Sequence, residues 1–418
     1  MPGFEVLRVR NYRLWWSHLS VANIGNWAQR VAQDWVALEL TGQSGTALGI
    51  VTAAQFLPFL LLAPVGGVIA DRFDARKVLF VTQAIIGGCA ALMAVLTGTG
   101  VVAFWHVVVI AFLLGCANAV FQPTIQSFVT DLVGPDLVSS AVGLSAASFN
   151  GARVIGPAIA GVMIASWTTW SVFTVTALSV LVPMWALVRL DPSQLYPSPK
   201  DRGRGLLKEG IRYAVRDRKV LRILGIAFFV GTFALNSQLT TALMATKEFG
   251  LGAGELGVLS SVLAFGSLVG AVFSAKRKVT TDKLVGYAAV VFCTVEIICG
   301  LMPGYVTFAV SLAVLGFTQL IFMTAANSRL QLVSDPAKRG RMMALYTLLL
   351  MGGTPLGAPL MGWFAEEFGA PWSLIGGGAL ALAGTVAVLV ALRGAVREDE
   401  PAPQPEPANI KAAAEPAA

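Results

Sequence analysis

Charged residues are scarce in this sequence. Only 13% of its 418 residues are Asp, Glu, Lys or Arg, whereas 56% are hydrophobic, and the mean hydropathy is +0.72. A soluble domain carries roughly 25% charged residues. The scarcity therefore excludes an ordinary soluble domain and indicates a polytopic membrane protein. The basic amino-terminal segment is followed by a long apolar run without a small-residue cleavage site, so we expect no cleaved signal peptide.

Histidine and cysteine are also rare. The chain has two histidines, and its four cysteines lie within apolar runs at spacings that match no metal site. We therefore expect neither a metal centre nor a disulfide framework. The sequence lacks a Gly-rich loop ending in Gly-Lys-Ser/Thr, which excludes ATP hydrolysis by that motif. It also lacks a Ser-His-Asp set within one aqueous compartment. These absences predict a protein that is not an enzyme and that needs no cofactor.

Long apolar runs are abundant instead. A helix needs about 20 mostly apolar residues to cross the hydrocarbon core of a bilayer. Twelve runs approach or exceed this length, and they predict an all-α polytopic membrane protein with twelve transmembrane helices. The runs cover roughly 13–40, 46–70, 78–98, 102–130, 138–166, 168–189, 220–246, 255–275, 284–302, 304–332, 341–366 and 371–392.

One long interruption divides the spans into six and six. Residues 190–219 contain three prolines and many charges. We predict an amino-terminal six-helix bundle over 1–189, a cytoplasmic linker over 190–219 and a carboxy-terminal six-helix bundle over 220–393. The Pro-, Ala- and Glu-rich end, 394–418, is predicted to be a disordered cytoplasmic tail.

The linker contains a second pattern. Apolar residues recur at helical spacing between lysines and arginines, which favours an amphipathic helix on the membrane surface over a plain solvated linker. The apolar positions are Leu206, Leu207, Ile211 and Ala214 or Val215.

Basic residues are distributed unevenly between the two sides of the predicted membrane. Of the 30 Lys and Arg residues, 26 lie in the amino-terminal segment, in the loops after every second span or in the tail, and the other loops hold one, Lys247. By the positive-inside rule, both termini and the linker are predicted to be cytoplasmic. This topology accounts for the net charge of +7, so we do not expect nucleic-acid binding.

The two halves repeat one another weakly. ARVIGPAIAGVMIA in span 138–166 aligns with GGTPLGAPLMGWFA in span 341–366, which sets Gly156 against Gly357 and Gly161 against Gly362. Gly66–Gly67, near the end of span 46–70, likewise has a counterpart in Gly266–Gly270. Twelve spans built as two related sixes are typical of secondary transporters, with pseudo-two-fold symmetry between the two bundles.

Several motifs carry a resemblance to a known family. GGVIADRFDARK, residues 66–77, resembles the loop signature of the major facilitator superfamily, and GPAIAG, residues 156–161, resembles the antiporter signature of its exporters. NWAQRVAQDWVALELTG, FQPTIQSFVTDLV, SAASFNGARVIGPA and RGRMMALY are similar to the enterobactin-exporter and macrolide-efflux branch of bacterial proteins. Asp74 stands where the signature usually has Gly, at a turn where we expect a left-handed backbone, which Asp tolerates better than most residues.

The resemblance implies the major facilitator fold and a function. It implies a secondary active transporter that exports an amphipathic small molecule, drug-like or siderophore-like, by alternating access in exchange for protons. The alternative is a lipid or lysophospholipid translocator of the same fold. It also implies a conformational latch between the halves and a hinge motif in span 138–166. The latch consists of Gly67, Asp71, Arg72, Arg76, Lys77 and Asp131, and the hinge motif of Gly156, Pro157 and Gly161.

Charged residues inside the spans are few and therefore informative, because charge within a bilayer is costly. Arg30 and Asp34 lie four residues apart in span 13–40, on one polar stripe, and Arg153 lies in span 138–166. Burial favours an uncharged Asp34 and a neighbouring arginine favours a charged one. We interpret Asp34 as the proton-coupling carboxylate, with Arg30 and Arg153 as candidate partners. The alternative is a permanent structural ion pair between Arg30 and Asp34.

Uncharged polar residues also recur in the spans that line the cavity in the family. We expect these side chains to contact the substrate, and the alternative is interhelical hydrogen bonding that only packs the bundle. Unlike many proton antiporters of the superfamily, the chain has no arginine within span 102–130, so Arg30 or Arg153 must supply the positive partner. Arg329 lies near the end of its span and is expected to extend to the membrane surface. The cavity candidates are Asn23, Asn26, Gln33, Gln122, Asn236, Gln238 and Asn327.

These expectations combine into one description. The chain is predicted to be a monomeric, multi-pass protein of the bacterial cytoplasmic (inner) membrane with both termini in the cytoplasm. Its expected partners are a small-molecule substrate, protons and membrane lipids.

Overall fold

The structure is a computed structural model that describes residues 2–196, 206–277, 280–335 and 338–393. Every regular element in these ranges is a helix, which confirms the all-helical prediction. Eleven helical segments are long and apolar enough to cross a membrane. The remaining long helix, α1 (Arg10–Leu40), falls short in apolarity because of its polar side chains, yet it packs into the bundle against α5 and α6.

The first half of the chain forms six helices joined by short turns. Helices α1, α5 and α6 pack together, and α4 packs against both α2 and α3. The helices after α1 are α2 (Gly45–Arg72), α3 (Ala75–Gly98), α4 (Phe104–Asp131), α5 (Val138–Ser166) and α6 (Thr169–Arg189).

The second half repeats this arrangement with two interrupted spans. One runs through α8 (Arg218–Phe229), the π-helical segment η4 (Val230–Ala234), α9 (Ser237–Leu243) and η5 (Met244–Glu248). The other is divided at Gly353 into α13 (Arg339–Gly352) and α14 (Thr354–Glu367). The uninterrupted helices are α10 (Ala253–Ala275), α11 (Asp282–Gly300), α12 (Tyr305–Val333) and α15 (Pro371–Ala391).

The linker contains the predicted helix, α7 (Leu206–Arg216), which packs against α13 and α8. The Tyr213 hydroxyl accepts a hydrogen bond from the Asp335 backbone N–H at 3.2 Å, and the Lys338 ammonium lies 4.7 Å from the Tyr213 ring centroid. Ala214 is buried, whereas Ile211 and Val215 are exposed. The side chains of 206–209 and the predicted tail, 394–418, lie outside the described residues. The membrane-surface placement of α7 stays a prediction.

Large apolar side chains remain exposed around both halves. Leu61, Val162, Leu178 and Val310 each have about 60% of their surface exposed. They belong to four different helices, α2, α5, α6 and α12, so apolar side chains are exposed on several sides of the bundle. These side chains therefore fit contact with lipid.

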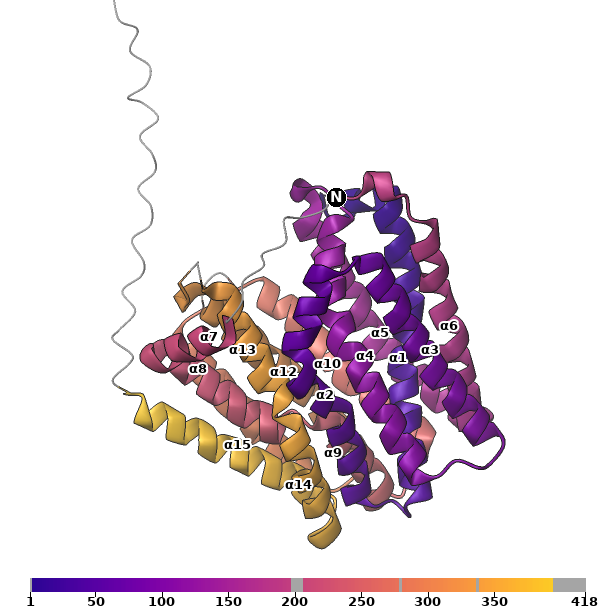
Figure 1. Cartoon of the computed structure of the whole chain (residues 1–418). Helices are drawn as coiled ribbons and strands as arrows, with labels where there is room; N and C mark the ends of the chain where they lie inside the picture. The colour runs from indigo at the N-terminus through magenta and orange to yellow at the C-terminus, as the bar shows by residue number, and fades with distance from the viewer. Residues whose placement is uncertain (1, 197–205, 278–279, 336–337, 394–418) are drawn as a thin grey trace, which may run out of the picture.

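The two ends of the molecule differ in how the halves meet. We call the end at which α1 begins and α7 lies the linker end, and the opposite end the far end; the linker end is at the top of Figure 1. At the far end, a side chain at Gly362 of α14 would overlap the Gly45 carbonyl of α2. A Cβ at Gly161 of α5 would lie 2.9 Å from the Ala253 carbonyl of α10. Two crossings of small residues therefore close the far end.

The internal repeat predicted from the sequence has a structural counterpart. Gly156 and Gly357 make close contacts within their own halves, with α1 and with η4. Gly161 and Gly362, five residues later in each helix, contact the opposite half. The two glycine pairs thus have matching roles in the two bundles.

Candidate functional site

The polar stripe of α1 faces the interior of the protein rather than lipid. Gln29, Gln33 and Asp34 are buried, and Arg30 is partly buried. In lipid such side chains would lack polar partners, so their burial against protein is expected. The candidate site is therefore the surface that α1 shares with α2 and α5.

Two arginines lie near one tryptophan at this surface. The guanidinium carbon of Arg30 is 5.8 Å from the Trp27 ring centroid, and that of Arg153 is 5.7 Å from the same centroid. Arg30 also lies 5.0 Å from the ring of Phe56 in α2. Cations at these distances are attracted to the negative faces of aromatic rings. The rings compensate part of the cost of burying two like charges.

The packing of α5 explains how Arg153 reaches Trp27. Gly156 has no side chain, and a Cβ there would lie 2.6 Å from the Trp27 Cβ and 2.8 Å from the Ile24 carbonyl oxygen. The close approach of α5 to α1 at Gly156 brings Arg153, one turn earlier, to the indole ring. Phe149, one further turn earlier, meets the same ring edge-to-face with centroids 5.6 Å apart. The predicted hinge motif thus also builds the candidate site.

Asp34 has no direct partner among the described residues. Its side chain is 9% exposed, and within those ranges its carboxylate receives no hydrogen bond and lies within 4.0 Å of no basic nitrogen. The alternative of a permanent Arg30–Asp34 ion pair is therefore absent from this conformation. Arg30 instead lies near the Trp27 and Phe56 rings, so it acts on Asp34 only through its charge at longer range.

The seven predicted cavity residues differ in burial and in hydrogen bonding. Asn236 is 3% exposed and donates hydrogen bonds to the Thr232 and Phe233 carbonyls, so its amide nitrogen supports the π-helical segment. Asn327 accepts a hydrogen bond of 2.7 Å from Gln331. Gln33 is 2% exposed. The other four are partly exposed, and within the described ranges their amides form no hydrogen bond to protein, so their contact with a substrate stays a prediction; they are Asn23, Asn26, Gln122 and Gln238.

The residues of the predicted latch lie in the second half of α2, at the start of α3 and at the end of α4. Arg76 donates a 2.9 Å hydrogen bond to the Leu187 carbonyl of α6. A Cβ added at Gly67 would meet no atom within 4 Å, whereas a Cβ added at Gly66 would overlap the Ala119 carbonyl of α4. Arg72 and Lys77 are exposed and Asp131 is partly exposed, while the Asp71 side chain lies outside the described residues. The latch stays a prediction.

Asp74 does not have the left-handed backbone expected from the sequence. Asp74 has φ −62° and ψ 119°, which is extended rather than left-handed backbone, and its carboxylate accepts a 2.8 Å hydrogen bond from the Arg76 N–H. Asp74 is thus the N-cap of α3, a position at which Asp is strongly preferred.

A polar contact between the halves was not anticipated from the sequence. At the far end, Glu366 of α14 accepts hydrogen bonds from the Gly45 N–H of α2 at 2.7 Å and from Lys247 at 3.3 Å. Lys247 is the lone basic residue of the loops on its side, and that isolation was the available signal. Phe56 and Phe149 were missed because aromatic residues in an apolar span look like ordinary packing.

In the described residues, eleven helices apolar enough to cross a membrane and the more polar α1 form two related halves, with charged and amide side chains between them, an arrangement typical of secondary transporters. A family model described as transmembrane secretion effector matches residues 2–414. The chain belongs to this family of major facilitator transporters, so it is a multi-pass membrane transporter and not an enzyme.

Relatives and solved structures agree with this assignment. The multidrug efflux pump Tap of Mycobacterium tuberculosis is 30% identical over 406 residues, 92% of this chain and 93% of the relative. Macrolide efflux protein A of Streptococcus pyogenes is 22% identical over 393 residues, 90% and 95%. The staphyloferrin A transporter of Staphylococcus aureus is 32% identical over 160 residues, 38% and 40%. An inward-facing bacterial homologue of the human lysosomal transporter Spinster covers 92% of this chain and 96% of its own, with a TM-score of 0.68 and 16% identity, which shows the major facilitator fold.

Proposed function

We propose that the chain exports an amphipathic small molecule, a drug or a siderophore, in exchange for protons. The similarity to the multidrug pump Tap over 92% of the chain supports an efflux substrate. The similarity to a staphyloferrin A transporter supports siderophores as a second substrate class. A lipid translocator is not favoured, because these relatives are named for drugs and a siderophore.

The site offers three kinds of contact to such a substrate. Trp27, Phe56 and Phe149 provide aromatic surface, and Arg30 and Arg153 provide cations that form no ion pair within 4.0 Å among the described residues. Asp34 provides an acceptor for an amine or hydroxyl group. Binding sites for small molecules combine an apolar lining with a few placed polar groups in this way. An amphipathic molecule satisfies all three contacts at once.

The single observation that carries the coupling proposal is the unpartnered carboxylate of Asp34. A buried ionised carboxylate without a partner is unfavourable, so it takes up either a proton or a polar group of the substrate. The two ligands exclude each other on one carboxylate. Release of substrate to one side therefore allows a proton to bind from that side, which is the linkage an exchanger needs.

Orientation follows from the basic residues. The linker end carries nearly all of them, so we propose that it faces the cytoplasm of a bacterium and that the far end faces outward. The closed far end then corresponds to a state with access from the cytoplasm. In the outward-facing state, we propose that the latch residues at the linker end hold the halves together.

The experiment is efflux from an efflux-deficient bacterial host that expresses the full chain, with a panel of macrolides, other antibiotics and siderophores. We expect reduced accumulation of at least one panel compound, and loss of that effect in Arg153→Gln. Asn150→Ala, one turn away on α5, is the matched control and is expected to keep the activity, because its amide only donates to the Ala146 carbonyl. Unchanged accumulation of every compound would rule out the proposal.

A further inference from the structure

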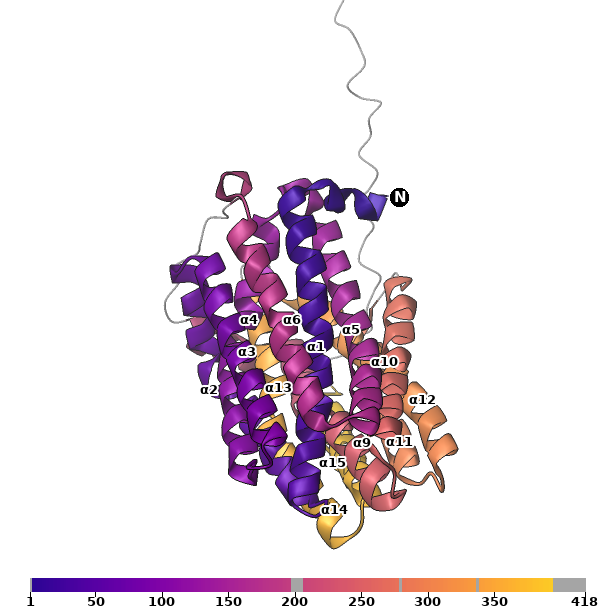
Figure 2. The same cartoon turned by 90° about the vertical axis from the view of Figure 1, so that its right-hand side faces the viewer.

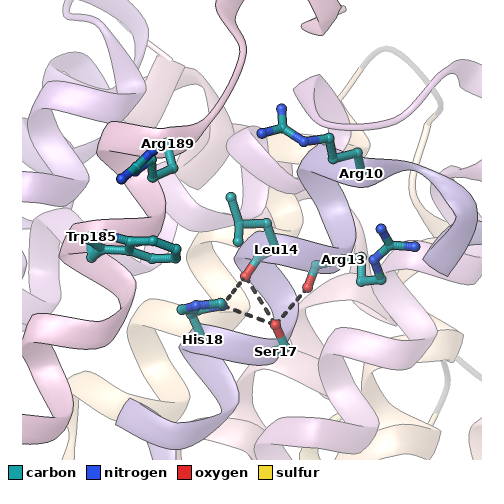
Figure 3. A pocket seen from close by; sticks show the side chains of 7 residues that line it. All are labelled: Arg10, Arg13, Leu14, Ser17, His18, Trp185 and Arg189. Carbon is teal, nitrogen blue, oxygen red and sulfur yellow. Dashed lines mark hydrogen bonds between the residues drawn. The ribbon is translucent and has the colours of Figure 1, made fainter.

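A cationic cavity lies at the linker end, away from the candidate substrate site. It has a volume of about 570 Å³ and opens between the start of α1 and the end of α6. Figure 2 shows these two helices side by side in front, on the outer surface of the first half. Figure 3 shows Arg10 and Arg189 on either side of the cavity, with His18 and Trp185 at its base, while the Arg13 guanidinium points away from it.

The three arginines form no ion pair within 4.0 Å with an acidic residue of the described ranges. Arg13 donates one hydrogen bond to the Leu7 carbonyl at 3.3 Å, and the Arg189 guanidinium lies 5.4 Å from the Trp185 ring centroid. A cavity flanked by the guanidinium groups of Arg10 and Arg189 favours a ligand with a negatively charged, multidentate oxygen group such as a phosphate.

One carboxylate lies near this cluster, and its charge is already engaged. Asp191 accepts hydrogen bonds from the Ser193 N–H at 3.0 Å, the Ser193 hydroxyl at 2.7 Å and the Gln194 amide at 3.1 Å. These hydrogen bonds from Ser193 first, and the charge of Arg10, hold the pKa of Asp191 below its usual range. A single carboxylate against three arginines leaves the cavity with net positive charge.

The floor of the cavity is aromatic. The His18 and Trp185 rings stack with centroids 5.3 Å apart at 22°. His18 Nδ1 lies 2.7 Å from the Leu14 carbonyl, and because a carbonyl only accepts, Nδ1 is the donor. Trp185 is half-exposed on the outer face of α6, as expected for a tryptophan at the membrane–water boundary.

A second, apolar groove continues along the same two helices toward the far end. It has a volume of about 130 Å³ and is lined by Val21 and Gly25 of α1, Val175 and Thr176 of α6 and Ile159 of α5. Val21 follows His18 by one turn of α1, so the groove begins about 5 Å beyond the cationic cavity. The Thr176 hydroxyl donates to the Gly25 carbonyl at 2.9 Å, so this groove lacks free polar groups that would require water.

We propose that the cavity and the groove together bind one anionic phospholipid of the leaflet at the linker end. Arg10 and Arg189 hold the phosphodiester and headgroup, the stacked rings lie beneath the glycerol, and one acyl chain lies in the groove. The succession of a cationic cavity and an apolar groove on the outer surface matches the chemistry of a lipid. Free phosphate would use the first part alone. The site is independent of the proposed transport substrate.

The test uses the purified full chain and native mass spectrometry with added phosphatidylglycerol or phosphatidylcholine. The double variant Arg10→Gln/Arg189→Gln is expected to retain phosphatidylglycerol about 30-fold less than wild type, with phosphatidylcholine unchanged. Arg216→Gln/Arg218→Gln removes the same charge from exposed positions at the same end and is expected to bind like wild type. Equal loss in both double variants would overturn the proposal, because it would show only a general charge effect.

A second arm distinguishes a lipid from a free phosphate. Val175→Trp fills the apolar groove and is expected to weaken retention of phosphatidylglycerol, whereas Leu178→Trp, an exposed position on the same helix that does not line the groove, is expected to have no effect. Glycerol 3-phosphate is expected to compete poorly. If it competes fully and Val175→Trp binds normally, the cavity is a site for soluble phosphates and the lipid proposal is wrong. Unchanged thermal unfolding of each variant confirms that the fold is intact.

Discussion

Removal of the Glu366 carboxylate is expected to open the far end. Glu366 Oε2 accepts from the Gly45 N–H at 2.7 Å and from Lys247 at 3.3 Å, and the Glu366 side chain is 40% exposed. Gly45 belongs to α2 and Glu366 to α14, so the 2.7 Å contact joins the two halves. It also places a negative charge at the amino terminus of α2, where the helix dipole favours it. The contact can exist only while the far end is closed.

The size of the effect follows from these contacts. A hydrogen bond to a charged group contributes about 1.5–3 kcal/mol, and an exposed ion pair about 0–1 kcal/mol. Because Glu366 is partly exposed, we take about 2 kcal/mol for the whole contact after screening. This free energy shifts the ratio of closed to open far ends by roughly 30-fold in Glu366→Ala.

The assay is a spin-label distance measurement across the far end. Labels at Glu39 of α1 and Glu248 of η5 place one exposed site on each half. Glu366→Ala is expected to add a population at longer distance, and Glu367→Ala, an exposed neighbour without a recorded contact, is the control. Identical distance distributions in wild type and Glu366→Ala would refute the idea that this contact stabilises the closed far end.

Three further outcomes are expected. Gly161→Ala crowds backbone oxygens of α10, so it should open the far end and reduce transport, at a cost of about 1–3 kcal/mol to the closed state. Gly143→Ala on the same helix meets open space and should leave both unchanged. The same spin-label distances and transport rates in the two variants would contradict this reasoning. Glu296 is fully buried with both oxygens unpartnered among the described residues, so Glu296→Leu should raise the thermal unfolding temperature, and a lower one would contradict the reasoning. Asp282→Asn breaks the buried ion pair with Arg329, in which Arg329 Nε and Asp282 Oδ1 are 2.8 Å apart. It should lower the free energy of unfolding by about 3–5 kcal/mol, measured by denaturant unfolding, and an unchanged free energy would contradict this reasoning.

The sequence predicted the helices and the repeat well because both depend on local pattern. Span lengths follow from apolar runs, and Gly161 and Gly362 could be paired because small residues at helix crossings recur at the same position in each half. Both glycines contact the opposite half in the structure. Such features need no knowledge of which side chain meets which.

The partners of charged residues could not be predicted in the same way. Spacing indicated that Arg30 could pair with Asp34, but Phe56 from another helix lies 5.0 Å from the guanidinium. Arg329 was expected to extend to the membrane surface, which stays a prediction, but its partner Asp282, 47 residues earlier at the start of α11, was not predicted. Helical periodicity gives the face on which a residue lies and not the residue that faces it.

Proton movement linked to substrate, in proteoliposomes that contain the purified chain, tests the central claim most directly. A pH-sensitive dye inside the vesicles should report a proton flux when a transported compound is added to wild type. Asp34→Asn should abolish that flux while exchange of labelled for unlabelled substrate continues, because the amide no longer takes up a proton but the rest of the site is intact. A normal substrate-linked proton flux in Asp34→Asn would contradict the account.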